Sequence, residues 1–375
     1  MIKRCLHVLA PWVSGTAVLL AASVAIAQPP GYILQQNQQQ LQPPPAAKPA
    51  TATAVATPAM PQASNRSSKA VHLGLLLPLD SLQLKEAAQV LKAGFDAAAA
   101  ANLDSNVQVS VASLTDDAAI EAGYQQLQSA GASFIVGPMT RQGVTQLAQS
   151  SKLPALVLNS LEKSPPASSK IWSLSLAVET EALPVVRLLQ DDGRQQPVLL
   201  FNAEPLSQRL RAAFADTWPN RGGKALREVD VSNPDPEQLN AALASADAVI
   251  LALDSKEAAA TGALLPETLP AYAVSLVNTQ QPAPSLQGVR FVDMPWFLMP
   301  DHPETRGIAR PSGNLTRATE RLYALGVDAY RLATALASGK PPAQIKLGGA
   351  TGDLRLGKGW QVQRELPSSV VGGTQ

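Results

Sequence analysis

The sequence predicts an α/β fold in two lobes, each a mostly parallel sheet flanked by helices. Short apolar runs recur along the chain from Val71 onward, and uninterrupted runs of this kind are typical of parallel strands buried on both faces. Turn residues follow each run, and apolar residues at helical spacing come next. About 300 residues carry this pattern, which is more than a single ordinary domain, so we expect two lobes.

The first lobe is expected to begin sharply at Val71. Val71–Leu77 (VHLGLLL) is a continuous apolar run ended by Pro78, and a helical pattern follows through Leu91 and Phe95. Further elements are expected as strands over residues 107–111, 134–136 and 156–158, and as helices over 118–130 and 140–151. Residues 70–178 and 318–343 are assigned to this lobe.

The second lobe is expected to repeat the same alternation. Its elements are helices over residues 182–190 and 205–218, and strands over 197–201, 248–253 and 272–275. Leu354 and Leu356 alternate with polar residues, as in a short strand. Residues 179–290 and 346–366 are assigned to this lobe, with crossing segments between the two lobes.

The first 27 residues predict a signal peptide. Lys3 and Arg4 are basic, an apolar stretch follows, and Ala25-Ile26-Ala27 is a small-residue cleavage site. An uncleaved membrane anchor is the alternative, because the apolar stretch has about the ~20 residues that a span needs. The only cysteine is Cys5, so no cysteine follows the cleavage site to take a lipid. We therefore expect a periplasmic protein without an outer-membrane lipid anchor.

Residues 28–69 predict a disordered linker. They are rich in Gln, Pro and Ala and lack the large apolar side chains that would offset the entropy of ordering. The expected role of this segment is a spacer.

Charge and cysteine content exclude several classes of function. The chain has 30 Lys+Arg against 29 Asp+Glu, and this balance argues against nucleic acid as a partner. With Cys5 in the predicted signal peptide, the mature chain has no disulfide and no cysteine nucleophile or metal ligand. His72 and His302 have no second ligand at helical spacing, so no metal site is expected.

Two fragments resemble enzyme motifs but are incomplete. Residues 352–358 have the spacing of a phosphate-binding loop, but Gly359 stands where a Ser or Thr must reach the magnesium ion. Ser160 and Lys163 match a serine-enzyme motif, but Pro165 follows at once and the third motif, K-T-G, is missing. We therefore expect a protein that is not an enzyme and has no cofactor.

Polar residues at the strand ends are the candidates for a binding cleft. In open parallel sheets ligands gather beyond the carboxyl ends of the strands. The candidates at these ends are Asp80, Ser81, Met139, Thr140, Asn159 and Ser160 in the first lobe, and Asn202, Glu204 and Ser275 in the second. In an amino-acid receptor, Thr140 and Ser160 would serve the carboxylate and Glu204 the amine.

The string around Asp293, Trp296 and Phe297 has two interpretations. The aromatic side chains can seal the seam where the chain crosses between the lobes. Alternatively, they can be exposed anchors of a protein interface.

Seven strings together resemble one known family. They are HLGLLLPLDS (72–81), AGFDAA (93–98), FIVGPMTRQGV (134–144), LPALVLN (153–159), GVRFVDMPWFL (288–298), ALGVDAYRLA (324–333) and GGATGDLRL (348–356). The stretch from residue 70 to residue 366 resembles the LppC family, the penicillin-binding protein activators. The resemblance implies that residues 70–375 form a binding-protein-like domain, similar to type I periplasmic binding proteins.

The resemblance also implies regulation rather than catalysis. It implies a regulator of peptidoglycan synthesis that binds and activates a class A penicillin-binding protein, with peptidoglycan or a small ligand as a further partner in the cleft. The alternative is a periplasmic solute-binding receptor for an amino acid or a similar small molecule. The chain departs from the family in having Gln28, not a lipidated cysteine, after the cleavage site, and only the linker where longer members carry a helical repeat domain.

Overall fold

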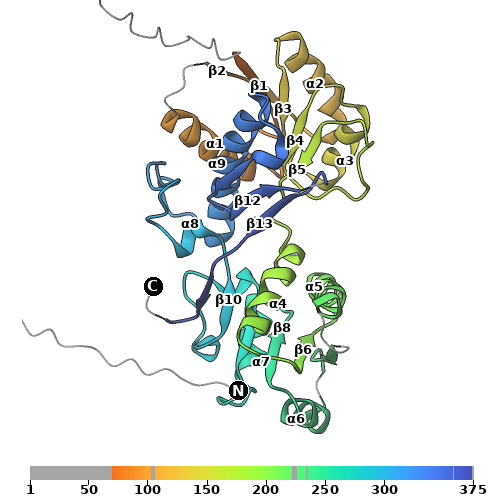
Figure 1. The fold of residues 1–375 in the computed structure, drawn as a ribbon, viewed down its shortest axis with the longest axis vertical. Coiled ribbons are helices and arrows are strands. Elements are labelled where there is room, and N and C mark those ends of the chain that lie inside the picture. Colours follow the sequence, from red (N-terminus) through yellow and green to blue (C-terminus); the bar gives the residue numbers. More distant parts are fainter. Residues whose placement is uncertain (1–69, 103–105, 222–225, 234, 358, 374–375) are drawn as a thin grey trace, which may run out of the picture. The chain divides into compact units, whose positions relative to one another are not determined.

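The computed structural model describes residues 70–102, 106–221, 226–233, 235–357 and 359–373. The predicted signal peptide (1–27) and linker (28–69) lie outside the described residues. The described chain forms two mostly parallel sheets and one small antiparallel sheet, with helices packed on the faces of the parallel sheets (Figure 1). The predicted α/β class with mostly parallel sheets is confirmed.

The first sheet has five parallel strands in the order β2-β1-β3-β4-β5. The strands are β1 (Val71–Leu77), β2 (Val107–Ser113), β3 (Phe134–Val136), β4 (Ala155–Val157) and β5 (Ile171–Ser173). The buried runs that the sequence predicts as β1 and β3 have the predicted bounds, and β4 begins one residue earlier than expected. The sequence interpretation missed β5, which has only three residues.

Four helices cover the two faces of this sheet: α1 (Lys85–Ala101), α2 (Ile120–Ser129), α3 (Arg141–Ser150) and α9 (Arg317–Ala337). Helices α1 and α9 share one apolar cluster with the sheet, and α2 and α3 share another on the opposite face. Helix α9 comes from far along the chain and lies beside α1 (Figure 1).

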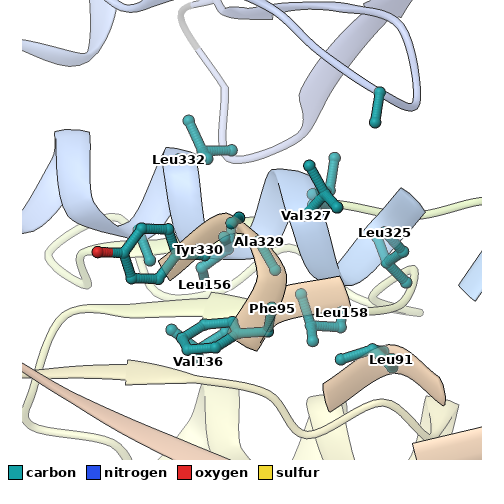
Figure 2. Packing of buried hydrophobic residues seen from close by; sticks show 14 of the residues in the cluster. Leu91, Phe95, Val136, Leu156, Leu158, Leu325, Val327, Ala329, Tyr330 and Leu332 are labelled. Atoms are coloured by element: carbon teal, nitrogen blue, oxygen red, sulfur yellow. The ribbon is translucent and has the colours of Figure 1, made fainter. Parts of the chain in front are cut away.

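Close approach of the α1 and α9 backbones depends on two glycines. A Cβ at Gly94 would overlap the carbonyl of Tyr323, and a Cβ at Gly326 would overlap the carbonyl of Leu91. Figure 2 shows the side chains of Leu91 and Phe95 among those of α9 and of the strands below. The rings of Phe95 and Tyr330 meet edge to face, with centroids 5.2 Å apart.

The second sheet has six strands in the order β14-β10-β9-β8-β6-β7, all parallel except β14. The strands are β6 (Pro197–Phe201), β7 (Arg227–Asp230), β8 (Ala248–Leu251), β9 (Ala271–Ala273), β10 (Arg290–Val292) and β14 (Ser368–Val370). The α-helices in this part are α4 (Ala182–Asp191), α5 (Pro205–Thr217), α6 (Pro236–Ala244), α7 (Ser255–Gly262) and the short α8 (Pro295–Leu298). Helices α4 and α5 share one apolar cluster with the sheet, and α6 and α7 share the other.

Single turns of 3-10 helix complete the described chain. They are Asp117–Ala119, Val178–Glu181, Pro219–Arg221, Ser275–Val277, Pro284–Leu286 and Pro342–Gln344. The last strand of the second lobe was expected over residues 272–275, but β9 ends at Ala273 and Ser275 begins a 3-10 turn.

Residues 346–366 do not join the second sheet, contrary to the sequence assignment. Strands β11 (Lys346–Gly348), β12 (Asp353–Leu356) and β13 (Val362–Glu365) form a separate antiparallel sheet. Leu354 and Leu356 of β12 and Val362 of β13 are buried in the same apolar cluster as residues of α1 and α9. Alternate side chains of a strand point to the same face, so both leucines of β12 face this cluster. The strand that returns to the second sheet is β14, which lies just beyond the predicted boundary at residue 366.

Candidate functional site

The ends of β3 and β4 bring four of the predicted cleft residues close together. Met139 and Thr140 follow β3, and Asn159 and Ser160 follow β4, its neighbour in the sheet. Asn159 Nδ2 donates a hydrogen bond of 2.9 Å to the backbone carbonyl of Met139. The Ser160 hydroxyl bonds that of Ser175 at 2.8 Å. The polar groups of Asn159 and Ser160 therefore bond within the chain.

Thr140 is the N-cap of α3. Its hydroxyl accepts a hydrogen bond of 3.0 Å from Gly143 N and donates one of 2.5 Å to Asp117 Oδ1. A side-chain acceptor at this position satisfies an amide that the helix leaves unpaired. The Thr140 hydroxyl thus stabilises the start of α3 and has no donor left for a ligand.

Asp80 and Ser81 lie in the loop after β1. Asp80 N donates to Leu114 O at 3.2 Å, and Ser81 N donates to Pro78 O at 3.3 Å. In the described part of the chain, no hydrogen bond joins either residue to the predicted cleft residues after β3 and β4. Ser81 is buried and Asp80 is exposed.

The end of β6 carries the next two predicted residues, Asn202 and Glu204. Asn202 Oδ1 accepts a hydrogen bond of 3.0 Å from Glu204 N, and the Glu204 side chain is exposed. Both residues line a cavity of about 520 Å³ with Arg209, Asp254 and Lys256. The sequence interpretation missed these last three residues. Asp254 could have been found, because it follows the strand β8 and caps α7.

Ser275 belongs to a buried polar cluster, which we define as Glu181, Ser275, Asn278, Asp293 and Arg321. Ser275 donates to the Glu181 carboxylate from its amide at 2.8 Å and from its hydroxyl at 3.0 Å. Arg321 donates to Ser275 O at 3.0 Å and to Asp293 Oδ2 at 2.5 Å, and Asn278 Nδ2 donates to the same Asp293 oxygen at 2.8 Å. Ser275 and Asp293, predicted separately, are thus joined through Arg321.

Burial shifts the acids of this cluster toward their neutral forms. Burial raises the pKa of Glu181 to about 7, opposed by the charge of Arg364 and reinforced by that of Asp293. Burial likewise raises the pKa of Asp293, opposed by Arg321 and Asn278. Arg364, on β13, donates to Thr351 O at 3.1 Å. Arg321 therefore links the cluster to α9, and the charge of Arg364 acts on it from β13.

We predict that Glu181 makes stability fall as the pH rises. Between pH 4.5, its ordinary pKa, and about 7, the folded chain keeps a proton that the unfolded chain has released. The free energy of unfolding should therefore fall through this window, by on the order of 3 kcal/mol. Urea unfolding at several pH values measures it. Glu181→Gln should flatten the slope, the exposed control Glu162→Gln should keep it, and an unchanged slope in Glu181→Gln would refute the prediction.

Trp296 and Phe297 are buried, with 1% and 6% of their surfaces exposed. Trp296 Nε1 donates to Glu320 at 2.9 Å, and the ring packs against Tyr323 in the cluster of α1 and α9. The Arg310 guanidinium lies over the indole, 3.7 Å from the ring centroid. Neither aromatic side chain is therefore available as an exposed anchor for a partner.

The fragments that resemble enzyme motifs have structural roles. Residues 353–356 of the phosphate-loop fragment form β12, and Ser160 bonds Ser175 rather than Lys163. His72 Nε2 lies 2.8 Å from Ser110 Oγ on the neighbouring strand. Among the described residues, no group of three His, Cys, Asp or Glu side chains could hold a metal ion.

No helix in the part of the chain that the structure describes is long and apolar enough to cross a membrane.

Comparison of the sequence with protein families finds one match. A family model described as "LppC putative lipoprotein" matches residues 25–260 and 238–368. The penicillin-binding protein activator LpoA of Mannheimia succiniciproducens is 29% identical over 310 residues, which cover 78% of this chain and 53% of that protein. LpoA of Klebsiella pneumoniae is 26% identical over 287 residues, covering 64% of this chain and 40% of that protein. The chain spans about half the length of these curated relatives.

Solved structures share the fold. The LpoA C-domain from Haemophilus influenzae, described as a regulator of PBP1A, superposes with a TM-score of 0.67 at 22% identity, covering 80% of this chain and 96% of that one. A protein from Chromobacterium violaceum, described as a "putative branched-chain amino acid ABC transporter", superposes with a TM-score of 0.74 at 43% identity, covering 80% and 99%. These similarities confirm the fold that the sequence strings imply.

Proposed function

Because the chain belongs to the LppC family, we propose that it is a non-enzymatic regulator that binds and activates a class A penicillin-binding protein. The family model spans most of the chain, and the curated relatives are named penicillin-binding protein activators. The matched part of this chain covers only 40% and 53% of those relatives, so the activity is proposed here for the binding-protein-like part that this chain carries.

One structural observation supports a protein partner over an amino acid. Of the three groups that a receptor would use, the Thr140 hydroxyl bonds Asp117 and Gly143, and the Ser160 hydroxyl bonds Ser175. Only Glu204 keeps an exposed side chain. A ligand that takes the Thr140 hydroxyl as its donor would have to break the bond to Asp117, which costs the desolvation of the group left unpaired. A protein surface can bind without using those groups.

We also propose that the protein acts in the periplasm. The basic start, the apolar stretch and Ala25-Ile26-Ala27 support export, and the family model is described as a lipoprotein. Gln28 at the predicted cleavage site leaves no cysteine for a lipid there. In this proposal residues 28–69 are a spacer that gives the folded part reach toward the synthase.

A reconstituted assay tests the activator role. A purified class A penicillin-binding protein is given lipid-linked precursor with and without this protein, and the fraction of crosslinked product is measured. We expect crosslinking to rise with protein concentration and to saturate, because binding is stoichiometric. The control is the same protein unfolded by heat. Unchanged crosslinking together with no association in sedimentation would refute the proposal.

A second candidate function is a solute receptor. It is favoured by one observation, the 43% identity to the Chromobacterium violaceum protein described as a "putative branched-chain amino acid ABC transporter". Thermal unfolding with leucine, isoleucine, valine and small muropeptides tests it. A ligand at about 100 times its dissociation constant stabilises the folded state by ~2.7 kcal/mol, which raises the melting temperature measurably. No shift with any of these compounds would exclude them as ligands.

A further inference from the structure

The apolar clusters of the described chain fall into two groups, and the core does not run continuously from one group to the other. Two clusters hold α1, α2, α3 and α9 on the first sheet, and one of them also holds the small antiparallel sheet. Two others hold α4, α5, α6 and α7 on the second sheet. Among the described residues, no strand of the second sheet contributes to the first group, and no strand of the first or the small sheet contributes to the second. We call the two groups, with the elements that they hold, the first part and the second part.

The chain passes from one part to the other at three short segments: residues 176–178, 292–294 and 362–366. Asp293 lies in the second of these crossing segments and Arg364 in the third. Hinges between rigid parts are usually a few residues at the ends of elements, which absorb the change in backbone dihedral angles. The three crossing segments are therefore the places where the two parts can turn against each other.

Arg321 joins the two parts. It belongs to α9 of the first part, and it donates to Ser275 O at 3.0 Å and to Asp293 Oδ2 at 2.5 Å. Ser275 follows β9 and Asp293 follows β10, so both acceptors lie at strand ends of the second sheet. The side chain of Arg321 is 17% exposed and that of Asp293 is 1% exposed, so solvent and salt screen this ion pair only weakly.

Arg364 joins the two parts at a second place. It lies on β13, and it donates to Thr351 O at 3.1 Å and to Thr180 Oγ1 at 3.3 Å. Thr351 is in the first part, in the turn whose amides bond Asp328 of α9. Thr180 is in the 3-10 turn just before α4, which belongs to the second part. Each of the two arginines therefore bonds groups on the far side of the boundary from the element that carries it.

We propose that Arg321 and Arg364 form a latch that fixes the angle between the two parts, and that the three crossing segments are the hinge on which the parts turn when the latch is broken. Apolar burial is not directional, so the clusters hold each part together without setting this angle. Hydrogen bonds from a planar guanidinium fix both the distance and the direction of their acceptors. Exposed ion pairs across the boundary, such as Arg141 with Glu179 at 3.7 Å, are too well screened to do the same.

Pulsed electron paramagnetic resonance of the full chain tests the latch, because it measures the distance between two spin labels. The labels are attached at Gln128→Cys, on α2 of the first part, and at Gln238→Cys, on α6 of the second part, both at exposed positions. Cys5→Ser removes the only native cysteine. We expect one narrow distance distribution while Arg321 is intact. Arg321→Gln should broaden the distribution and shift its mean, because Asp293 is left buried without its cation and draws in water.

The matched control is Arg331→Gln. Arg331 lies on the same helix and is 18% exposed, and it likewise donates to one backbone carbonyl and one carboxylate, Gly348 O and Glu304 Oε2, both at 2.8 Å. Gly348 is on β11, and Glu304 lies in the segment between α8 and α9 that packs in the first part, so these bonds do not cross the boundary. The distribution should therefore stay as in the wild type. Arg321→Lys keeps the charge without the planar fork and should fall between the wild type and Arg321→Gln.

Three results overturn the proposal. They are a broad distribution while Arg321 is intact, an Arg321→Gln distribution that matches the wild type, and an equal shift in Arg331→Gln, which would indicate general loosening of α9. If circular dichroism shows that Arg321→Gln does not fold, Asp293→Asn tests the same ion pair. Its amide oxygen can still accept the bond of 2.8 Å from Met294 N, and the same shift is expected. An unchanged distribution in Asp293→Asn then overturns the latch.

Discussion

Replacing Gly326 by alanine is expected to lower the free energy of unfolding by about 3 kcal/mol, because an added Cβ has no room between α9 and α1. The new atom would overlap Leu91 O and press on Phe95 N, and both belong to the backbone of α1 rather than to a side chain that can turn away. The helices would have to separate and lose packing in the largest apolar cluster of the described chain. This cost exceeds the ~1 kcal/mol that alanine gains over glycine inside a helix.

Urea unfolding followed by circular dichroism measures this effect. Gly94→Ala should destabilise by a similar amount, because its Cβ would overlap Tyr323 O from the other helix. The control is Gly307→Ala, where nothing lies within 4 Å of the added Cβ and little change is expected. If Gly326→Ala were as stable as Gly307→Ala, the result would contradict the close packing of α9 against α1 at Gly326.

Replacing Asp328 by alanine is expected to cost about 4 kcal/mol, because it leaves buried donors without an acceptor. Asp328 is fully buried in α9. Its carboxylate accepts from Ala350 N at 2.8 Å, from Thr351 N at 2.7 Å and from Thr351 Oγ1 at 2.6 Å. These bonds hold the turn between β11 and β12 against α9. Their loss in Asp328→Ala should therefore also destabilise the packing of the small antiparallel sheet on α9.

A graded series checks the role of Asp328. Thr351→Val removes one donor and leaves the carboxylate its two amide partners, so it should cost only about 1 kcal/mol. Asp328→Asn keeps one acceptor oxygen and should fall between the two variants. Chemical unfolding of all three measures the order, and equal losses in Asp328→Ala and Thr351→Val would contradict the account.

The polar residues that hold the structure together could be recognised only in part from the sequence. Asp328 and Gly326 stand in the string ALGVDAYRLA, which carries the family resemblance, but nothing in the string shows that the carboxylate accepts from residues 350 and 351. Glu181 is one of several acids near the start of α4. Only its burial against Ser275 distinguishes it from its neighbour Glu179.

The strand-end rule predicted where four of the candidate cleft residues lie, but not which of their polar groups are already hydrogen-bonded. It placed Met139, Thr140, Asn159 and Ser160 at neighbouring strand ends, where the structure has them. It could not show that Thr140 and Ser160 bond within the chain, because those partners are set by how the loops fold. For the same reason the sequence could not decide whether Trp296 is buried or exposed, because its burial depends on distant residues that cover the ring.

The sequence by itself determined the alternation of buried strands and helices, the parallel sheets and the family. These follow from patterns within short stretches, where apolar spacing reports which face of each element is covered. The tertiary structure alone showed that the strands within residues 346–366 form a sheet of their own. It also showed that α1 and α9 pack closely at Gly94 and Gly326, and which acidic side chains are buried. Contacts between segments far apart in the chain decide these features, and no local pattern encodes them.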